Sequence, residues 1–329
     1  MGRHALTVSS STLRTVVLIL TAGGLASGAL ACGSARSEEG SPVIAADTHA
    51  AAVEAWRDQH EADYRRDYAS IEGLHFLAPG SHTVGSAAAN DLVLSADVPS
   101  TIGRLVVEES AVRFEPAPGV KVSRTGQPVT GPIMLKEADA PPADEIVIAA
   151  VRLVVHLSGD RLSLRVRDPE GERATAFRGF SWFSIDSAYV VRGRFVADHE
   201  PRRLRVVNTF GDVDEYATEG VVEFELQGVR LRLRPFTTRP NRLYFVFRDA
   251  SSGEETYETA RFLYADLQED GTTVLDFNQA YNPPCAFNPY TTCPIPLSEN
   301  VLPVKVLAGE RAYTTASAST RLHPFAFAR

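Results

Sequence analysis

The chain has 329 residues, 41 acidic and 33 basic side chains, and a formal net charge of −8 at pH 7. Its hydrophobic content of 44% is ordinary for a folded protein and argues against a disordered chain, and its length allows one large or two ordinary domains. No block of lysine or arginine stands alone, which argues against nucleic acid as the main partner.

The first residues predict an export signal. Arg3, His4 and Arg14 form a basic start without an acidic residue, and an apolar run over 15–31 ends in small residues directly before Cys32. This run is short for a membrane-spanning helix. We therefore expect residues 1–31 to be a signal peptide.

Cys32 leaves two export routes open. In the lipoprotein route it becomes the acylated first residue, and lipid holds the protein on a membrane without a transmembrane helix. In the ordinary route, cleavage after Ala31 leaves a free thiol. A cysteine between ALA and the polar stretch GSARSEEGS favours the first route. We expect a lipid-anchored protein on the outer face of a bacterial membrane, with a periplasmic or secreted protein as the alternative, and a flexible tether over 32–46.

Residues 47–70 predict one amphipathic helix. The stretch contains no glycine or proline, and Asp47 or Thr48 is a suitable N-cap. Aromatic and apolar residues follow a three- and four-residue spacing that favours a face packed on the domain. These residues are Val53, Trp56, His60, Tyr64 and Tyr68.

From residue 71 onward the pattern predicts strands. Short β-branched or alternating segments are separated by Gly, Asp and Pro, and Gly159-Asp160 and Gln227-Gly228 predict tight hairpin turns. No long helical pattern recurs between them. We predict a mainly β protein with two packed sandwich or barrel units. The units cover 71–136 and 145–310, an acidic stretch with two prolines joins them at 137–145, and a tail follows over 311–329.

The segment 77–131 resembles the front of a forkhead-associated (FHA) domain. The resemblance rests on Val84-Gly85 before a loop, on the segment NDLVL from Asn90 to Leu94, and on the paired short strands that follow. It implies a β-sandwich. That family reads phosphothreonine peptides with an arginine where this chain has Ser86, so the strong bidentate phosphate contact is missing and we do not expect the phosphopeptide function.

A second resemblance, to the domain-of-unknown-function family DUF 1684, spans nearly the whole mature chain. It rests on NDLVL, FRGFSWFSID, FVFRDASSGEETYETARFL and the long LDFNQAYNPPCAFNPYTTCPIPLSENVLPVKVLAGE. The family implies no known activity.

The loop 276–294 carries two of the three cysteines. Cys285 and Cys293 are eight residues apart, and in an oxidising compartment a disulfide closing this loop would stabilise by about 2.6 kcal/mol. Packed free thiols and a catalytic thiol remain as alternatives. We expect no metal, because zinc needs four N or S ligands and no histidine lies nearby, and no cofactor, because no binding motif is present.

Two polar segments predict where a ligand would bind. The candidates are Arg248, Asp249, Tyr257, Arg261, Asp276, Asn278, Tyr281 and Asn282. If the strands of the two segments pair, Arg248 or Arg261 can meet Asp276. The alternative role for these groups is to hold the loop by internal hydrogen bonds.

Two functions follow from these residues. The absence of known catalytic motifs favours a non-catalytic binding or envelope-accessory protein with a small-molecule or envelope ligand. The alternative is a hydrolase-like enzyme with its site in the C-terminal β unit.

Overall fold

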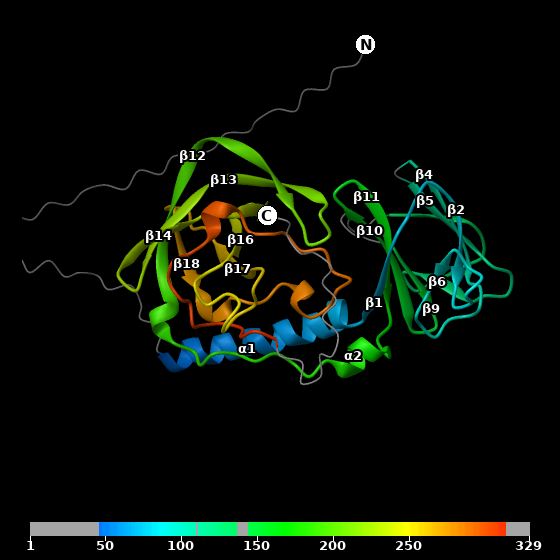
Figure 1. Ribbon diagram of the computed structural model, residues 1–329, viewed down its shortest axis with the longest axis horizontal. Helices are drawn as coiled ribbons and strands as arrows, with labels where there is room; N and C mark the ends of the chain where they lie inside the picture. The colour runs from blue at the N-terminus through cyan, green and yellow to red at the C-terminus, as the bar shows by residue number, and fades with distance from the viewer. Residues whose placement is uncertain (1–45, 110, 137–143, 314–329) are drawn as a thin grey trace, which may run out of the picture. The chain divides into compact units, whose positions relative to one another are not determined.

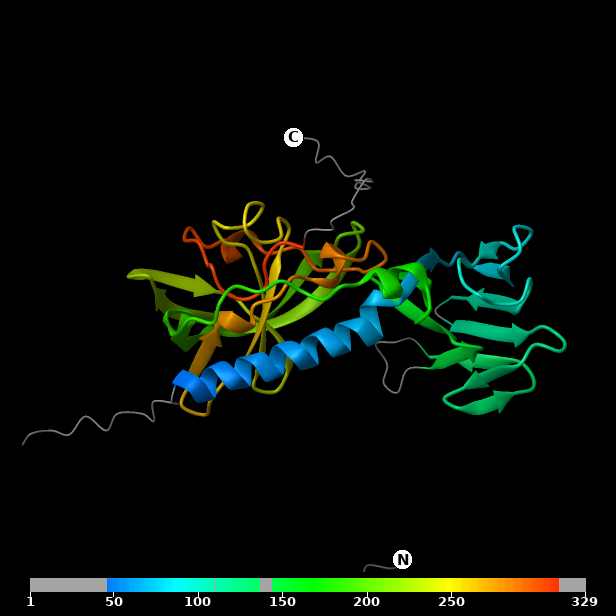
Figure 2. The ribbon, with the colours of Figure 1, turned by 90° about the horizontal axis from the view of Figure 1, so that it is seen from below.

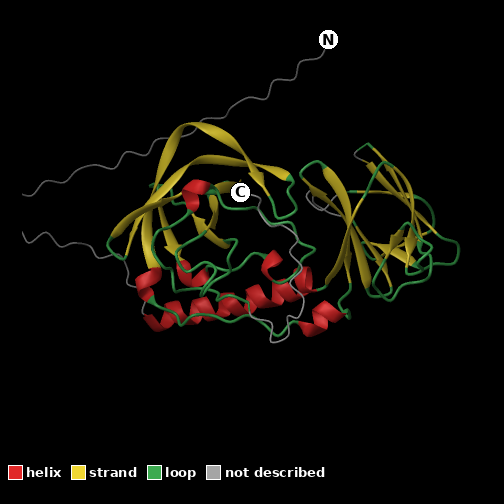
Figure 3. Ribbon diagram, in the orientation of Figure 1, coloured by secondary structure: helices red, strands yellow, loops and turns green. Residues whose placement is uncertain are grey.

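The computed structural model describes residues 46–109, 111–136 and 144–313, and strands are its main regular structure (Figure 3). The mainly β prediction is therefore confirmed. The predicted signal peptide, Cys32, almost all of the tether and most of the tail lie outside the described residues. Within the described ranges, no helix is long and apolar enough to cross a membrane.

The predicted N-terminal helix is confirmed. It consists of α1 (Ala46–Tyr64) and a five-residue π-helical turn, η1 (Arg65–Ala69). Val53 and Tyr64 of the stripe are buried, whereas Tyr68 at the end of η1 is 37% exposed. The stripe therefore faces the protein, and its last ring reaches solvent.

The first β unit is a sandwich of two open sheets. Its sheet orders are β1-β11-β10-β9-β6-β7 and β3-β2-β4-β5-β8. Its strands are β1 (Ile71–Phe76), β2 (Gly80–Gly85), β3 (Leu92–Val93), β4 (Gly103–Glu108), β5 (Ala111–Pro116), β6 (Val122–Arg124), β7 (Gln127–Val129), β8 (Ile133–Leu135), β9 (Glu145–Ile148), β10 (Val151–Ser158) and β11 (Arg161–Arg167). One hydrophobic cluster, which includes the buried Phe114 and Leu153, fills the space between the sheets.

The predicted join at 137–145 is wrong as a domain boundary. Strands β9 to β11 follow that stretch, yet they pair in one sheet with β1, β6 and β7. The first sandwich thus extends to Arg167, because non-local strand pairing decides the boundary and local composition does not.

The second β unit follows the short helix α2 (Glu172–Ala176) and an extended segment. Its sheets have the orders β14-β13-β12-β18 and β15-β16-β17, and neither closes into a barrel. Its strands are β12 (Val190–Val207), β13 (Val213–Leu226), β14 (Val229–Leu233), β15 (Phe236–Arg239), β16 (Arg242–Phe247), β17 (Arg261–Asp266) and β18 (Thr272–Asp276). Short 3-10 turns are η2 (Ser187–Tyr189), η3 (Phe277–Gln279), η4 (Pro284–Ala286) and η5 (Ser298–Asn300).

Both predicted hairpin turns are confirmed. Ser158 pairs with Arg161 and Leu226 pairs with Val229, so each connection has two residues. Gln227 and Gly228 both have positive φ, as a tight turn that follows the twist of the strands requires.

Helix α1 runs along the second β unit (Figures 1 and 2). Near its start, His49 Nε2 lies 2.8 Å from Asp276 Oδ2 at the end of β18. At its end, the Tyr64 hydroxyl donates to the Pro284 carbonyl oxygen over 3.2 Å. The helix therefore forms a wall against the loop that follows β18.

Candidate functional site

Arg261 and Asp249 form a fully buried ion pair, and both side chains have 0% exposure. Arg261 Nη1 donates to Asp249 Oδ2 and to the Val306 carbonyl oxygen, each over 2.9 Å, and Nη2 donates to the Ala308 carbonyl oxygen. Asp249 Oδ1 also accepts from the backbone and hydroxyl of Ser251. The pair ties the chain after 305 to β17, so these two candidates hold the fold.

Asp276 does not meet either arginine, and that prediction is wrong. Its carboxylate contacts His49 on α1 and accepts from the backbone and amide nitrogens of Asn278. Arg261 is occupied by Asp249, and Arg248 is exposed. His49 lies 227 residues away in the sequence, so no local pattern pointed to it.

Asn278 and Tyr257 are also hydrogen-bonded or packed within the fold. Asn278 is buried, its Oδ1 accepts from the backbone N–H of Asp186, and its Nδ2 donates to the Asp186 carbonyl oxygen. Tyr257 is half-buried beside Cys285, and burial raises the pKa of its phenol. Asn278 thus clamps the segment before η2 to the loop after β18.

The other two candidates, Tyr281 and Asn282, line a cavity that we call the aromatic pocket. Its volume is about 190 Å³, and α1, η1, β16, β17 and the loop after β18 contribute to it. Its lining residues are His60, Asp63, Tyr64, Tyr68, Tyr244, Phe262, Tyr264, Tyr281, Asn282 and Pro284. The pocket is therefore built from segments that lie far apart in the sequence and close together in the fold.

The walls of the aromatic pocket are rings in mutual contact. The centroids of His60 and Tyr281 lie 4.5 Å apart, and Tyr244 and Tyr264 stack at 4.7 Å with an interplanar angle of 17°. Phe262 packs edge-on against Tyr244 at 5.2 Å. Rings held by such contacts lose little further freedom when a ligand arrives.

Two buried polar atoms of the pocket lining have no hydrogen-bond partner among the described residues. They are His60 Nε2 and Asn282 Oδ1. Burial lowers the pKa of His60 to about 4, so its ring is neutral at pH 7. Buried polar groups are nearly always paired, and one left unpaired costs about 1–3 kcal/mol. Both residues line the cavity, so a ligand that contacts these atoms would supply the missing partner.

Asn282 is held in place from behind by a buried carboxyl group. Its backbone N–H and its Nδ2 donate to the two oxygens of Glu310 over 2.8 Å each, and Nδ2 also donates to the Arg311 carbonyl oxygen. Burial raises the pKa of Glu310 to about 8. Since these contacts use the nitrogens of Asn282, its Oδ1 remains for another group.

Lysine and arginine are absent from the pocket lining, and Asp63 is its one acidic residue. Asp63 accepts from Gln59 over 2.9 Å and from Arg66 over 2.8 Å, and its side chain is 44% exposed. The interior thus offers aromatic faces and neutral polar groups. It has no charge left over for a charged ligand.

A larger hollow lies on the other side of α1 and is less suited to a ligand. Its volume is about 610 Å³, and charged residues of α1 and η1 line it together with Arg152. Arg65 is paired with Glu61, and Arg66 is paired with Asp63 and Asp67. We interpret this open groove as a solvated surface of ion pairs.

The predicted disulfide is not formed in this structure. Cys285 and Cys293 are free, buried thiols in one hydrophobic cluster, and the backbone N–H of Cys285 donates to Cys293 Sγ over 3.3 Å. Burial raises the pKa of the Cys285 thiol, which leaves almost no thiolate at pH 7. The catalytic-thiol alternative thus lacks its nucleophile.

The loop around the cysteines connects three parts of the chain. Asn288 Nδ2 donates to the carbonyl oxygens of Tyr68 and Ile71 over 2.9 and 2.8 Å. His156 Nε2 of the first sandwich lies 3.0 Å from Thr292 Oγ1, and the backbone N–H of Cys293 donates to Thr209 Oγ1. The loop has these contacts because it lies where the three parts of the chain meet.

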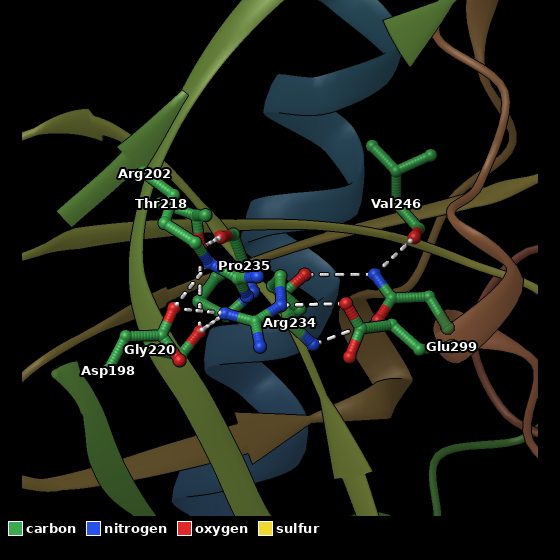
Figure 4. A network of polar contacts seen from close by, with 9 residues as sticks. Asp198, Arg202, Thr218, Gly220, Arg234, Pro235, Val246 and Glu299 are labelled. Atoms are coloured by element: carbon green, nitrogen blue, oxygen red, sulfur yellow. Dashed lines mark hydrogen bonds and ion pairs between the residues drawn. The ribbon is translucent and has the colours of Figure 1, made fainter. Parts of the chain in front are cut away.

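A contrasting polar cluster lies around Arg234, between β13, β14 and η5 (Figure 4). Arg234 Nε donates to Glu299 over 2.7 Å, and Nη1 donates to Asp198 over 2.6 Å and to the Gly220 carbonyl oxygen over 3.1 Å. The Asn300 side chain accepts a hydrogen bond from the backbone N–H of Arg234 and donates one to the Arg234 carbonyl oxygen. No side-chain atom of this cluster is buried without a partner, so it is a structural tie.

The sequence did not identify several pocket residues. Tyr244, Phe262 and Tyr264 fit an ordinary strand pattern, and Glu310 lies outside any motif. The aromatic stripe of the helix was the available signal, because it supplies His60 and two further rings. Among the described residues, no group of three or more His, Cys, Asp or Glu is arranged to hold a metal.

Comparison with known proteins finds a family match over part of the chain and no activity. No curated protein matches the chain. The solution NMR structure of an uncharacterized protein of Haloarcula marismortui is 30% identical, covers 44% of this chain and 82% of its own, and has a TM-score of 0.37. A family model described as a protein of unknown function (DUF1684) matches residues 175–311. The match begins after the first sandwich and thus covers less than the resemblance predicted. The similarity to the DUF1684 family is thus shown for residues 175–311.

Proposed function

We propose that the protein is an exported, lipid-anchored binding protein that holds a small ligand in the aromatic pocket without chemical conversion. The observation that carries the proposal is the pair of unpartnered atoms, His60 Nε2 and Asn282 Oδ1, at one cavity. A ligand that bonds both atoms recovers the cost of their desolvation. Preformed aromatic walls with a few placed polar groups are typical of ligand sites.

The hydrolytic alternative has less support. Its residues were to form one cleft, but Arg261 and Asp249 are closed on each other, and Asp276 and Asn278 bond α1 and the segment before η2. Only Tyr281 and Asn282 of the candidates reach the pocket. No observation on the described residues favours a nucleophile there.

Export and anchoring are carried by the N-terminal sequence, which lies outside the described residues. We expect the Cys32→Ser variant to be found in the soluble fraction, whereas the natural chain partitions into the detergent phase of a Triton X-114 extraction. Equal partition of both chains would contradict the lipid anchor and leave pocket binding untouched.

The disulfide is part of the export proposal. The two thiols lie side by side, and a disulfide-donating oxidant of the outer compartment would take two protons and two electrons from them. We expect thiol counting on denatured, unreduced protein to detect no free thiol from Cys285 and Cys293. Two free thiols would contradict it.

The resemblances beyond 175–311 also remain proposals. We propose that the first sandwich is FHA-like in fold without phosphopeptide binding, and that α1 and this sandwich precede the DUF1684 segment in relatives of this chain. Since α1 supplies one wall of the pocket, a relative without that helix would lack the site.

Pocket binding is tested with a matched pair of variants on α1. His60→Phe keeps an aromatic ring but removes the unpartnered nitrogen, whereas Gln59→Ala changes an exposed neighbour that contacts Asp63. The full mature chain is screened by thermal shift against neutral, cationic and anionic ring compounds. We expect one class to raise Tm for the natural chain and for Gln59→Ala, but not for His60→Phe. No shift with any class, or an equal shift in all three proteins, would contradict the proposal.

A further inference from the structure

We infer, on the basis of the proposed binding function, that the ligand of the aromatic pocket is one neutral pyranose ring, either a free sugar or the terminal residue of an envelope glycan. Four properties of the pocket point to this class: its size, its lack of free charge, its aromatic faces and the two unpartnered polar atoms.

Size limits the ligand to a single ring. The cavity volume of about 190 Å³ is below the ~300–1,000 Å³ that is usual for sites of drug-sized ligands. Tyr68 is 37% exposed and the Asp63 side chain 44% exposed, so these two residues mark an opening to solvent. A ring can enter there, and a chain attached to it can continue outside.

The charges at the pocket favour a neutral ligand over acids and amines. An anion would find no lysine or arginine in the lining. A cation would find Asp63 already bonded to Arg66, and the guanidinium of Arg242 lies 5.0 Å from the ring centre of Tyr264. A buried charge without a partner is costly, so a neutral ligand fits best.

The polar atoms select a sugar over a neutral aromatic compound. Asn282 Oδ1 is an acceptor and therefore needs an O–H or N–H donor from the ligand. His60 Nε2, which has no partner either, needs another polar group of the same ligand. These atoms come from the loop after β18 and from α1. A pyranose carries hydroxyl groups around its ring and can reach both, while its C–H face packs on tyrosine rings. A phenol or indole, with one polar group, satisfies one atom only.

The experiment compares rings of the same size and different charge by isothermal titration calorimetry on the full mature chain. The probes are glucose and N-acetylglucosamine (neutral), glucuronate (anionic) and glucosamine at a pH where its amine is protonated. We expect a neutral sugar to bind at least about tenfold more tightly than either charged ring. Equal or tighter binding of a charged ring would overturn the inference.

Variants and further probes locate the binding and identify the source of the sugar. Tyr68→Ala should weaken neutral-sugar binding about tenfold, because it removes a stacking wall at the opening, whereas Tyr290→Ala outside the pocket should leave Kd unchanged. Tighter binding of chitotriose than of N-acetylglucosamine would indicate a glycan end, and binding of the free sugar alone would indicate a soluble one.

The two proposals fail in different ways. Binding of phenol or indole that His60→Phe abolishes, with no binding of any neutral sugar, would overturn the sugar inference and leave the pocket function standing. Absence of binding by every probe would overturn the sugar inference, and with a silent thermal-shift screen it would overturn the pocket function as well.

Discussion

The Arg234 cluster and the aromatic pocket are both buried and polar, but they differ in how their atoms are paired. Around Arg234, two carboxylates, a backbone carbonyl group and the Asn300 amide take up the polar groups (Figure 4). In the pocket, His60 Nε2 and Asn282 Oδ1 have no partner among the described residues. A closed network stabilises a fold, whereas an open one has a stability cost that a ligand can remove. These two clusters therefore differ in pairing rather than in polarity.

The largest effect is expected where the closed network is broken. Arg234→Ala removes the cation from between Asp198 and Glu299, whose side chains are 20% and 36% exposed. Breaking a buried pair costs about 3–5 kcal/mol, and the partial exposure of the partners places this loss near the lower end. Urea unfolding of both proteins measures the loss.

Arg202→Ala is the matched control for Arg234→Ala. Arg202 donates to the same carboxylate, Asp198, over 3.1 Å, but its side chain is 48% exposed. Exposed pairs contribute about 0–1 kcal/mol, so the control should lose little. If both variants lose the same free energy of unfolding, burial is not the cause and the comparison fails.

The second prediction concerns pH and the carboxyl group behind the pocket. Burial lowers the pKa of His60 to about 4 and of His156 to about 3, and it raises the pKa of Glu310 to about 8. In the unfolded chain these pKa values are about 6.5 for His and 4.3 for Glu. Below pH 6.5 the unfolded chain binds the additional histidine protons, so stability rises with pH, and the single opposing proton of Glu310 offsets part of this slope.

Above pH 6.5 the sign reverses. The folded chain then keeps the Glu310 proton that the unfolded chain has lost, so this contribution to stability falls as pH rises through about 8. We expect a maximum near pH 6.5 and a loss of about 2 kcal/mol by pH 9. Urea unfolding across pH 5–9 measures the curve, and Glu310→Gln should remove the fall above pH 6.5. A fall that persists in Glu310→Gln would assign it to another group.

Local patterns predicted some parts of the molecule well. The helix over 47–70 and the two-residue hairpins at Gly159-Asp160 and Gln227-Gly228 depend on spacing within a few residues, and the structure confirms them. The boundary at 137–145 was not predicted correctly, because it depends on how distant strands pair.

The aromatic pocket shows most clearly which contacts the sequence could not predict. The ring centroids of His60 and Tyr281 lie 4.5 Å apart although more than 200 residues separate them in the sequence. Asp276 pairs with His49 over a similar sequence separation. The sequence indicated the polar loop and the aromatic stripe separately. It contained no signal that one would pack on the other, because their contact depends on how α1 lies against β16 and β17.

The smallest expected effect is a gain in stability rather than a loss. It tests most directly the difference between the Arg234 cluster and the aromatic pocket. His60→Phe keeps the ring that stacks on Trp56 at 5.0 Å, but it removes the buried nitrogen without a partner. Removing such a group recovers about 1 kcal/mol, so we expect the variant to unfold at a slightly higher urea concentration in the absence of ligand. The same variant should lose ligand binding, as expected when a site carries a cost for function. If His60→Phe were destabilised as strongly as Arg234→Ala, the imidazole would be another closed tie, and the case for the pocket would lose its main observation.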